Sequence, residues 1–146
     1  MKDGIDHINI YSKGEAQLGR DLSNFADLQI ETLDGPFASI EGYWYWLNAP
    51  ESDRKELLRE KYGYSAKALG RLLRAKDWNE SETFKLKIAS AMISKLVKYE
   101  HLLWIFKESS LPFRHYYVFN GNVVEPESGK WIIETWEFLR NLVKNN

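Results

Sequence analysis

The chain of 146 residues is long enough for one compact domain, and we expect a single domain over residues 1–146. Its 20 basic and 21 acidic residues give a formal net charge of -1, which excludes the strong positive field that non-specific nucleic-acid binding requires. Because cysteine is absent, disulfides and thiolate metal sites are excluded, and the chain is predicted to be cytoplasmic, in a host cell if its source is a virus.

Two short strands are predicted near the N-terminus, at residues 7–12 (HINIYS) and 28–33 (LQIETL). In each, apolar residues alternate with polar ones, as expected of a strand with one polar face. The turn pair Asp34 and Gly35 follows the second strand. Residues 13–27 hold two glycines and several turn-forming residues, and they are predicted to form a surface loop.

The centre of the chain is predicted to be helical. Ser39 is a suitable N-cap for a helix that runs to about Ala49, with Pro50 beyond its end. A strongly charged helix is predicted over residues 52–63. A further helix is predicted over residues 65–76, with Ser65 as its cap.

The rest of the chain is predicted to form helices and one β-hairpin. The longest helical pattern covers residues 80–97, and residues 99–109 either continue this helix or bend away from it. Asn120 followed by Gly121 between short apolar runs predicts a β-hairpin. An amphipathic helix is predicted over residues 127–143. The expected fold class is mainly α (α+β): a single-domain helical bundle with short β-strands and a β-hairpin.

The spacing of candidate metal ligands does not favour a metal site. His7, His101 and His115 lie far apart in the sequence. No Walker loop, strand-linked GxGxxG motif or nucleophile elbow is present. No apolar run approaches the roughly 18 residues of a membrane span. We therefore predict no metal, no cofactor and no membrane partner.

Glu41 precedes a run of four aromatic residues, Tyr43 to Trp46, at the start of a predicted helix. The positive end of the helix dipole fixes a carboxylate there and favours its ionised form. Such a carboxylate could orient a ribose, activate water or stabilise an oxocarbenium ion. Alternatively, Glu41 is an ordinary first-turn residue and the rings belong to the core. Tyr45 is expected to share the face of Glu41, while Trp44 and Trp46 serve packing.

Three further groups have chemistry suited to a nucleotide. Ser23 and Asn24 offer a hydroxyl and an amide in a loop, although they also suit an ordinary turn. Arg71, after Gly70 on a predicted helix, could hold a phosphate, whereas most exposed arginines are only solvated. Trp78 could stack on a base or cover the core.

Taken in order, these segments resemble the NADAR (NAD and ADP-ribose) superfamily, also called YbiA-like. The first is INIYSKGEAQLGRDLSNFADLQIETLDGPFASIEGYW, residues 8–44, with a YS element, an SNF loop, a short strand pair and a helix start with serine and glutamate. The second is SAKALGRLL, residues 65–73, which is similar to an A-x-x-x-G-R segment and is followed by Trp78. The resemblance extends over roughly residues 8–106.

The resemblance implies a YbiA-like fold, mostly helical with small β elements, and an N-glycosidase activity on ribose linked to a nitrogen base. The implied substrates are ADP-ribosylated guanine, NAD-related nucleotides or ribosylamino pyrimidines of riboflavin synthesis, with a modified base in nucleic acid as a further partner. Carried over by position, Glu41 is the catalytic carboxylate. The predicted substrate-binding residues, with Tyr45 added for its helix face, are Ser23, Asn24, Tyr43, Tyr45, Asn48, Gly70, Arg71 and Trp78.

Two departures from the family pattern concern the site itself. Gly42 stands where the family commonly has histidine, and Asn48 stands where it has a lysine. If that lysine forms an imine with the opened ribose, Asn48 cannot do so. The later D-x-Y-W-G and G-x-N-x-L-G segments of the family are not recognisable. The alternatives to an active hydrolase are therefore an inactive ADP-ribose or nucleotide-binding module and a protein-interaction domain that uses its aromatic surface.

Overall fold

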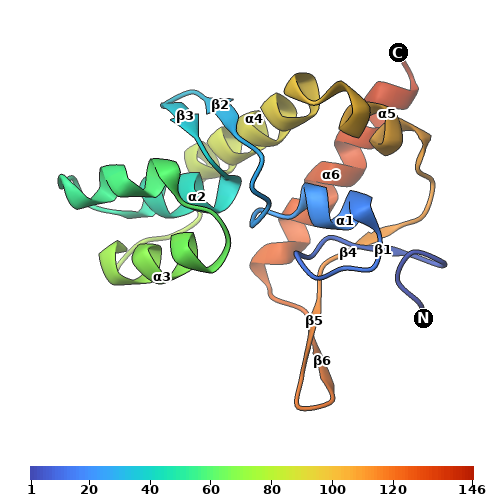
Figure 1. The fold of residues 1–146 in the computed structure, drawn as a ribbon, viewed down its shortest axis with the longest axis horizontal. Coiled ribbons are helices and arrows are strands. Elements are labelled where there is room, and N and C mark those ends of the chain that lie inside the picture. The colour runs from blue at the N-terminus through green and yellow to red at the C-terminus, as the bar shows by residue number, and fades with distance from the viewer. The chain divides into compact units, whose positions relative to one another are not determined.

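The computed structural model describes residues 1–146 and contains six α-helices, one 3₁₀ helix and three two-stranded sheets (Figure 1). The predicted fold class, mainly helical with short strands and a β-hairpin, is confirmed. The chain forms two compact units: a terminal unit of Met1–Ser23 with Tyr99–Asn146, and a central unit of Asn24–Lys98. None of the helices has the length and apolar composition needed to cross a membrane.

The central unit combines a small antiparallel sheet with helices. Strand β2 (Ile30–Thr32) pairs with β3 (Gly35–Phe37), and Ile30 lies opposite Phe37. The helices are α2 (Ile40–Asn48), η1 (Arg54–Glu60), α3 (Gly63–Leu73) and α4 (Glu82–Lys98). Helix α2 packs against α3 and η1, and α4 packs against β2. The buried core of this unit includes Ile30, Phe37, Ile40, Leu58, Ile88 and Met92.

Helix α2 begins where the sequence predicts it. The Ser39 hydroxyl accepts a hydrogen bond from the Gly42 N–H at 3.0 Å and donates one to the Lys61 carbonyl at 2.8 Å. Ser39 is therefore the N-cap of α2 and also an anchor for the chain just before α3. The helix ends at Asn48, two residues before Pro50.

The two segments after α2 differ from their predictions in detail. The segment predicted as a charged helix over residues 52–63 forms the 3₁₀ helix η1. Helix α3 begins at Gly63 rather than near Ser65, because the Ser65 hydroxyl donates to the Tyr62 carbonyl and does not cap the helix. Gly63 has a φ of 55°, a left-handed conformation that glycine adopts without strain.

The terminal unit joins both ends of the chain through a short parallel sheet. Strand β1 (Ile8–Asn9) pairs with β4 (Phe113–Arg114). The helices of this unit are α1 (Gln17–Leu22), α5 (Glu100–Glu108) and α6 (Ser128–Lys144). The prediction of one surface loop over residues 13–27 is wrong, because this segment contains α1, whose leucines are buried. A break at Tyr99 separates α5 from α4.

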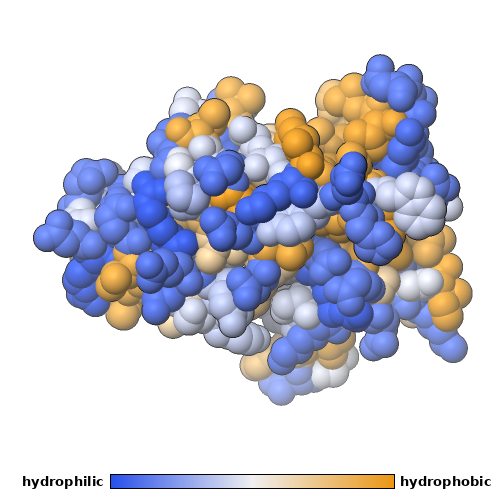
Figure 2. Space-filling model, turned by 45° about the horizontal axis from the view of Figure 1, so that its top comes forward, coloured by the Kyte–Doolittle hydropathy of each residue, from blue (hydrophilic) through white to orange (hydrophobic).

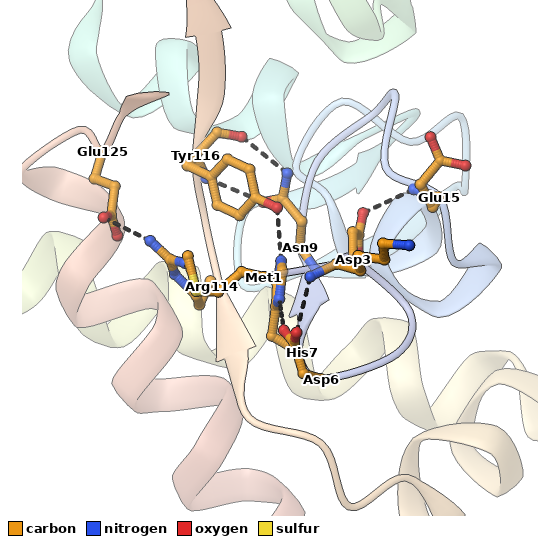
Figure 3. Close-up of polar contacts among 10 residues, drawn as sticks. Met1, Asp3, Asp6, His7, Asn9, Glu15, Arg114, Tyr116 and Glu125 are labelled. Atoms are coloured by element: carbon orange, nitrogen blue, oxygen red, sulfur yellow. Dashed lines mark hydrogen bonds and ion pairs between the residues drawn. The ribbon is translucent and has the colours of Figure 1, made fainter. Parts of the chain in front are cut away.

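Polar side chains inside the terminal unit hold its N-terminal segment (Figure 3). The buried His7 ring lies between Asp6 and Tyr116: its Nδ1 is 2.6 Å from the Asp6 carboxylate, and its Nε2 is 2.6 Å from the Tyr116 hydroxyl. The Asn9 side chain exchanges two 3.0 Å hydrogen bonds with the Tyr116 backbone. The expected polar outer face of this strand is wrong, because His7 and Asn9 are buried among these partners.

The predicted hairpin is confirmed. Strand β5 (Tyr117–Phe119) pairs with β6 (Asn122–Val124) around Asn120 and Gly121, whose φ angles are 51° and 78°. Positive φ at both central residues matches a type I′ turn. On the face shown in Figure 2, hydrophobic residues form several separate groups among hydrophilic ones.

Candidate functional site

One face of α2 carries three of the predicted site residues. Glu41, Tyr45 and Asn48 follow one another at spacings of four and three, so they lie along one side of the helix. The Glu41 N–H donates a hydrogen bond to the Asn24 carbonyl at 2.9 Å. This bond ties the loop of the SNF motif to the first turn of α2 and brings Asn24 beside Glu41.

Helix α3 meets this face of α2 at Gly70. A Cβ atom at Gly70 would overlap the Tyr45 ring, so glycine is needed for the two helices to approach this closely. Lys67 and Arg71, one helical turn apart on α3, act electrostatically on the Glu41 carboxyl group. The set that we call the Glu41 site comprises Asn24, Glu41, Tyr45, Asn48, Lys67, Gly70 and Arg71.

The Glu41 carboxyl group is an acid with a strongly altered affinity for its proton. Burial raises its pKa from 4.5 to about 7, and the positive charges of Lys67 and Arg71 limit the increase. Burial thus outweighs the helix dipole, which was expected to favour the ionised form. Glu41 takes part in none of the salt bridges. At neutral pH both protonation states are populated, as general acid–base catalysis requires.

The Tyr45 phenol shares this environment. Burial and the charge of Glu41 raise its pKa, and Arg71 opposes the increase. The hydroxyl is therefore neutral at physiological pH, and it can donate or accept a hydrogen bond.

Two carbonyl oxygens of the site have no hydrogen-bond donor. The Oδ1 atoms of Asn24 and Asn48 are buried, and neither has a partner. The Asn48 Nδ2 donates to the Trp44 carbonyl at 2.9 Å, which sets the orientation of that amide. Buried acceptors without a donor are rare in folded proteins, and each requires an explanation such as a functional role.

Trp78 belongs to an aromatic cluster beside the site. Its ring centre lies 6.2 Å from that of Trp44 and 4.8 Å from that of Phe84. Trp44 also meets Phe84 edge-on at 4.8 Å. Trp44 connects this cluster to α2, and its backbone carbonyl accepts the hydrogen bond from the Asn48 side chain.

Tyr43 and Ser23 are the two predicted site residues outside the set that forms the Glu41 site. Tyr43 lies on another face of α2, where its hydroxyl donates to the Asp34 carboxylate at 2.7 Å and its fully buried ring contacts Phe37. Ser23 is the last residue of the terminal unit, where it follows α1 and is buried. The SNF motif therefore spans the boundary between the two units.

Local packing explains the glycine after Glu41. A Cβ atom at Gly42 would lie 2.5 Å from the Leu58 carbonyl oxygen and 3.1 Å from that of Lys61. The segment that includes the end of η1 thus covers the first turn of α2. A histidine, usual in the family at this position, has no room here.

Lys67 is the site residue that sequence reasoning missed. It precedes Arg71 by four residues on a predicted helix, and this spacing places both cations on one face. That spacing could have identified it. Its Nζ lies 6.0 Å from the centre of the Phe25 ring, in the SNF loop. No group of three or more His, Cys, Asp or Glu side chains is arranged to hold a metal ion.

Replacing Lys67 with Gln is expected to raise the Glu41 pKa further, because it removes the positive charge that opposes the effect of burial most strongly. A ¹³C NMR titration of the Glu41 carboxyl carbon measures this shift. The control is Lys76→Gln, an exposed lysine after α3. The prediction fails if Lys67→Gln leaves the titration where the wild type and the control have it.

The site and the fold together define a small α+β protein in which a partly buried glutamate at a helix start faces a helix that carries two cations. No family model matches the sequence, and neither does any curated protein. The fold matches the NMR structure of the E. coli protein YbiA with a TM-score of 0.68 and 17% sequence identity, over 96% of this chain and 89% of that chain. The chain therefore has the YbiA fold, and the YbiA-like fold predicted from the motifs is confirmed.

Proposed function

We propose that this protein is a hydrolase that cleaves the N-glycosidic bond between a ribose and a nitrogen base in an ADP-ribose-like or ribosylated-base nucleotide. The observation that carries the proposal is the Glu41 carboxyl group, which combines burial, a pKa of about 7 and two neighbouring cations. The NADAR resemblance gives the catalytic role to the same residue. The structural similarity to YbiA supports the fold, on which the assignment of this role to Glu41 depends.

In the proposed reaction, protonated Glu41 donates its proton to the leaving base as the bond between C1′ and nitrogen breaks. The ionised carboxylate then stabilises the oxocarbenium charge on the ribose and takes a proton from the attacking water. Glu41 gives one proton to the base and takes one from water, so it ends the cycle protonated. The arrangement of the site suits the remaining tasks: Lys67 and Arg71 would hold a phosphate, and Asn24 would orient the sugar.

Turnover is expected to fall as the pH rises above about 7, because the acidic proton of Glu41 is then lost. The fall approaches about tenfold per pH unit for a single required proton. The measurement is kcat/KM across neutral pH with NAD, ADP-ribosylated guanine nucleotide and a ribosylamino pyrimidine. A rate that rises with pH over this range would contradict the role of general acid. No turnover of any of these compounds would contradict hydrolase activity.

Asn48 favours a second candidate, a nucleotide-binding module without turnover. An amide cannot form the imine that a lysine could form with an opened ribose. Calorimetric titration with ADP-ribose and NAD, followed by chromatography of the mixture, separates the two candidates. Binding without product supports the module, and product formation excludes it.

A further inference from the structure

Asn48 is a buried polar residue of the central unit with only part of its hydrogen-bonding capacity used. It is the last residue of α2 and only 3% exposed. Its Nδ2 donates to the Trp44 carbonyl, whereas its Oδ1 is buried without any donor. The Trp44 carbonyl is also the normal acceptor for the Asn48 backbone N–H within an α-helix. The helix therefore does not need the Asn48 side chain, and that side chain leaves one buried acceptor unpaired.

The position of Asn48 relates this acceptor to the Glu41 site. Asn48 follows Glu41 by two helical turns on the same face, which separates the two residues by about 10 Å along the helix axis. Tyr45 lies between them, against Gly70 of α3. A second unpaired acceptor, Oδ1, belongs to Asn24, whose backbone carbonyl accepts a hydrogen bond from the Glu41 N–H. Residues with an unpaired acceptor thus occur next to Glu41 in space and two turns further along α2, and the charges of Lys67 and Arg71 on α3 act on Glu41.

We propose that Asn48 is a specificity-determining residue whose Oδ1 accepts a hydrogen bond from a hydroxyl or amino group of the ligand. The inference rests on the proposed function, because it takes the ligand to be a nucleotide bound at the Glu41 site. It adds the requirement that the ligand extends along α2 and presents a donor about 10 Å from Glu41. Asn48 then selects its ligand by a hydrogen bond, without any covalent step at this position.

The first test needs no ligand. A buried acceptor without a donor destabilises the free protein, so replacing it with an apolar side chain of similar size removes that penalty. Asn48→Leu is therefore expected to melt at the same temperature as the wild type or higher. Thr83→Leu, an exposed polar residue of α4, is the control for a change from polar to apolar outside the site. A lower melting temperature for Asn48→Leu, or failure of this variant to fold, would show a structural role and overturn the proposal.

The second test measures binding. Asn48→Leu is expected to weaken binding of ADP-ribose at least about fivefold by calorimetry, because a donor of the ligand is left unpaired. A hypoxanthine analogue of ADP-ribose, which lacks the adenine amino group, identifies the donor. If the donor is the adenine amino group, Asn48→Leu does not weaken binding of the analogue. If the donor is a ribose hydroxyl, the loss persists.

The outcomes separate this inference from the proposed function. Wild-type protein that binds neither ADP-ribose nor NAD contradicts both. Wild-type binding that Asn48→Leu leaves unchanged contradicts the role of Asn48 alone. Weaker binding by Asn48→Leu, with the melting temperature retained and Thr83→Leu unaffected, supports the role of Asn48.

Discussion

Replacing Glu41 with Gln is expected to reduce kcat at least about 100-fold, the lower end of what a positioned acid–base group contributes. Gln has nearly the same shape and keeps a hydrogen-bonding amide, so the affinity for ADP-ribose should change little. Single-turnover kinetics with the substrates named above, together with calorimetric titration, test both parts. Equal turnover by the variant and the wild type would remove Glu41 from the reaction.

The same variant is expected to be more stable than the wild type at high pH. In the folded protein Glu41 keeps its proton up to a pH of about 7. In the unfolded chain the same carboxyl group loses its proton near pH 4.5. Between these values the folded state binds more protons, so wild-type stability falls as the pH rises. At about 1.4 kcal/mol per pKa unit, the full loss is about 3 kcal/mol, and it is complete above pH 7. Gln carries no charge and avoids this loss.

Urea denaturation at acidic and alkaline pH measures this effect. The two proteins should have similar free energies of unfolding at a pH below 4.5, and the variant should be more stable above 7. Glu31→Gln, an exposed position on β2, is the matched control and should show no such divergence. A constant difference between Glu41→Gln and the wild type at every pH would contradict the raised pKa.

Replacing Gly70 with Ala is expected to destabilise the protein by about 1–3 kcal/mol, because the new Cβ overlaps the Tyr45 ring at the contact between α2 and α3. At an exposed helix position the same change would stabilise by about 1 kcal/mol, so the sign of the effect reports the contact. Thermal and urea denaturation measure it. Because Tyr45 must move, binding of ADP-ribose should weaken as well.

A double-mutant cycle isolates the contact between Gly70 and Tyr45. Tyr45→Gly removes both the ring and the Cβ atom that the new Cβ would meet. In that background Gly70→Ala should lose most of its penalty, because the two positions are directly coupled. If Gly70→Ala costs the same in both backgrounds, the penalty comes from another part of the structure.

Local sequence signals predicted much of the fold. Ser39 caps α2 as expected, because an N-cap needs only its own hydroxyl and the next backbone amides. The β5–β6 hairpin is also correct, because Asn120 and Gly121 tolerate the positive φ that the turn requires. Helix α1 was missed, because its six residues fold against neighbours that no short window of sequence contains.

The candidate site was predicted only in part. Features that depend on local helical spacing were predicted correctly, and features that depend on contacts between distant residues were not. Helical spacing places Tyr45 on the face of Glu41 and Tyr43 on another face, which is the arrangement in the structure. The likeness to a family nevertheless placed Tyr43 in the site, whereas its hydroxyl binds Asp34, nine residues away in the sequence. The spacing of four residues before Arg71 marks Lys67 as a candidate, and the packing of α3 on α2 then shows that this cation acts on Glu41.

The sequence by itself determined the helical class of this protein, the start of α2 with Glu41 in its first turn, and the hairpin, because each depends on residues close together in the chain. The tertiary structure alone decided the chemistry of Glu41. Burial sets its pKa, the contact of Gly70 with Tyr45 brings the cations of α3 to it, and the surroundings of Asn24 and Asn48 leave two acceptors unpaired. These properties arise from groups that are distant in sequence, and they exist only when the helices are packed.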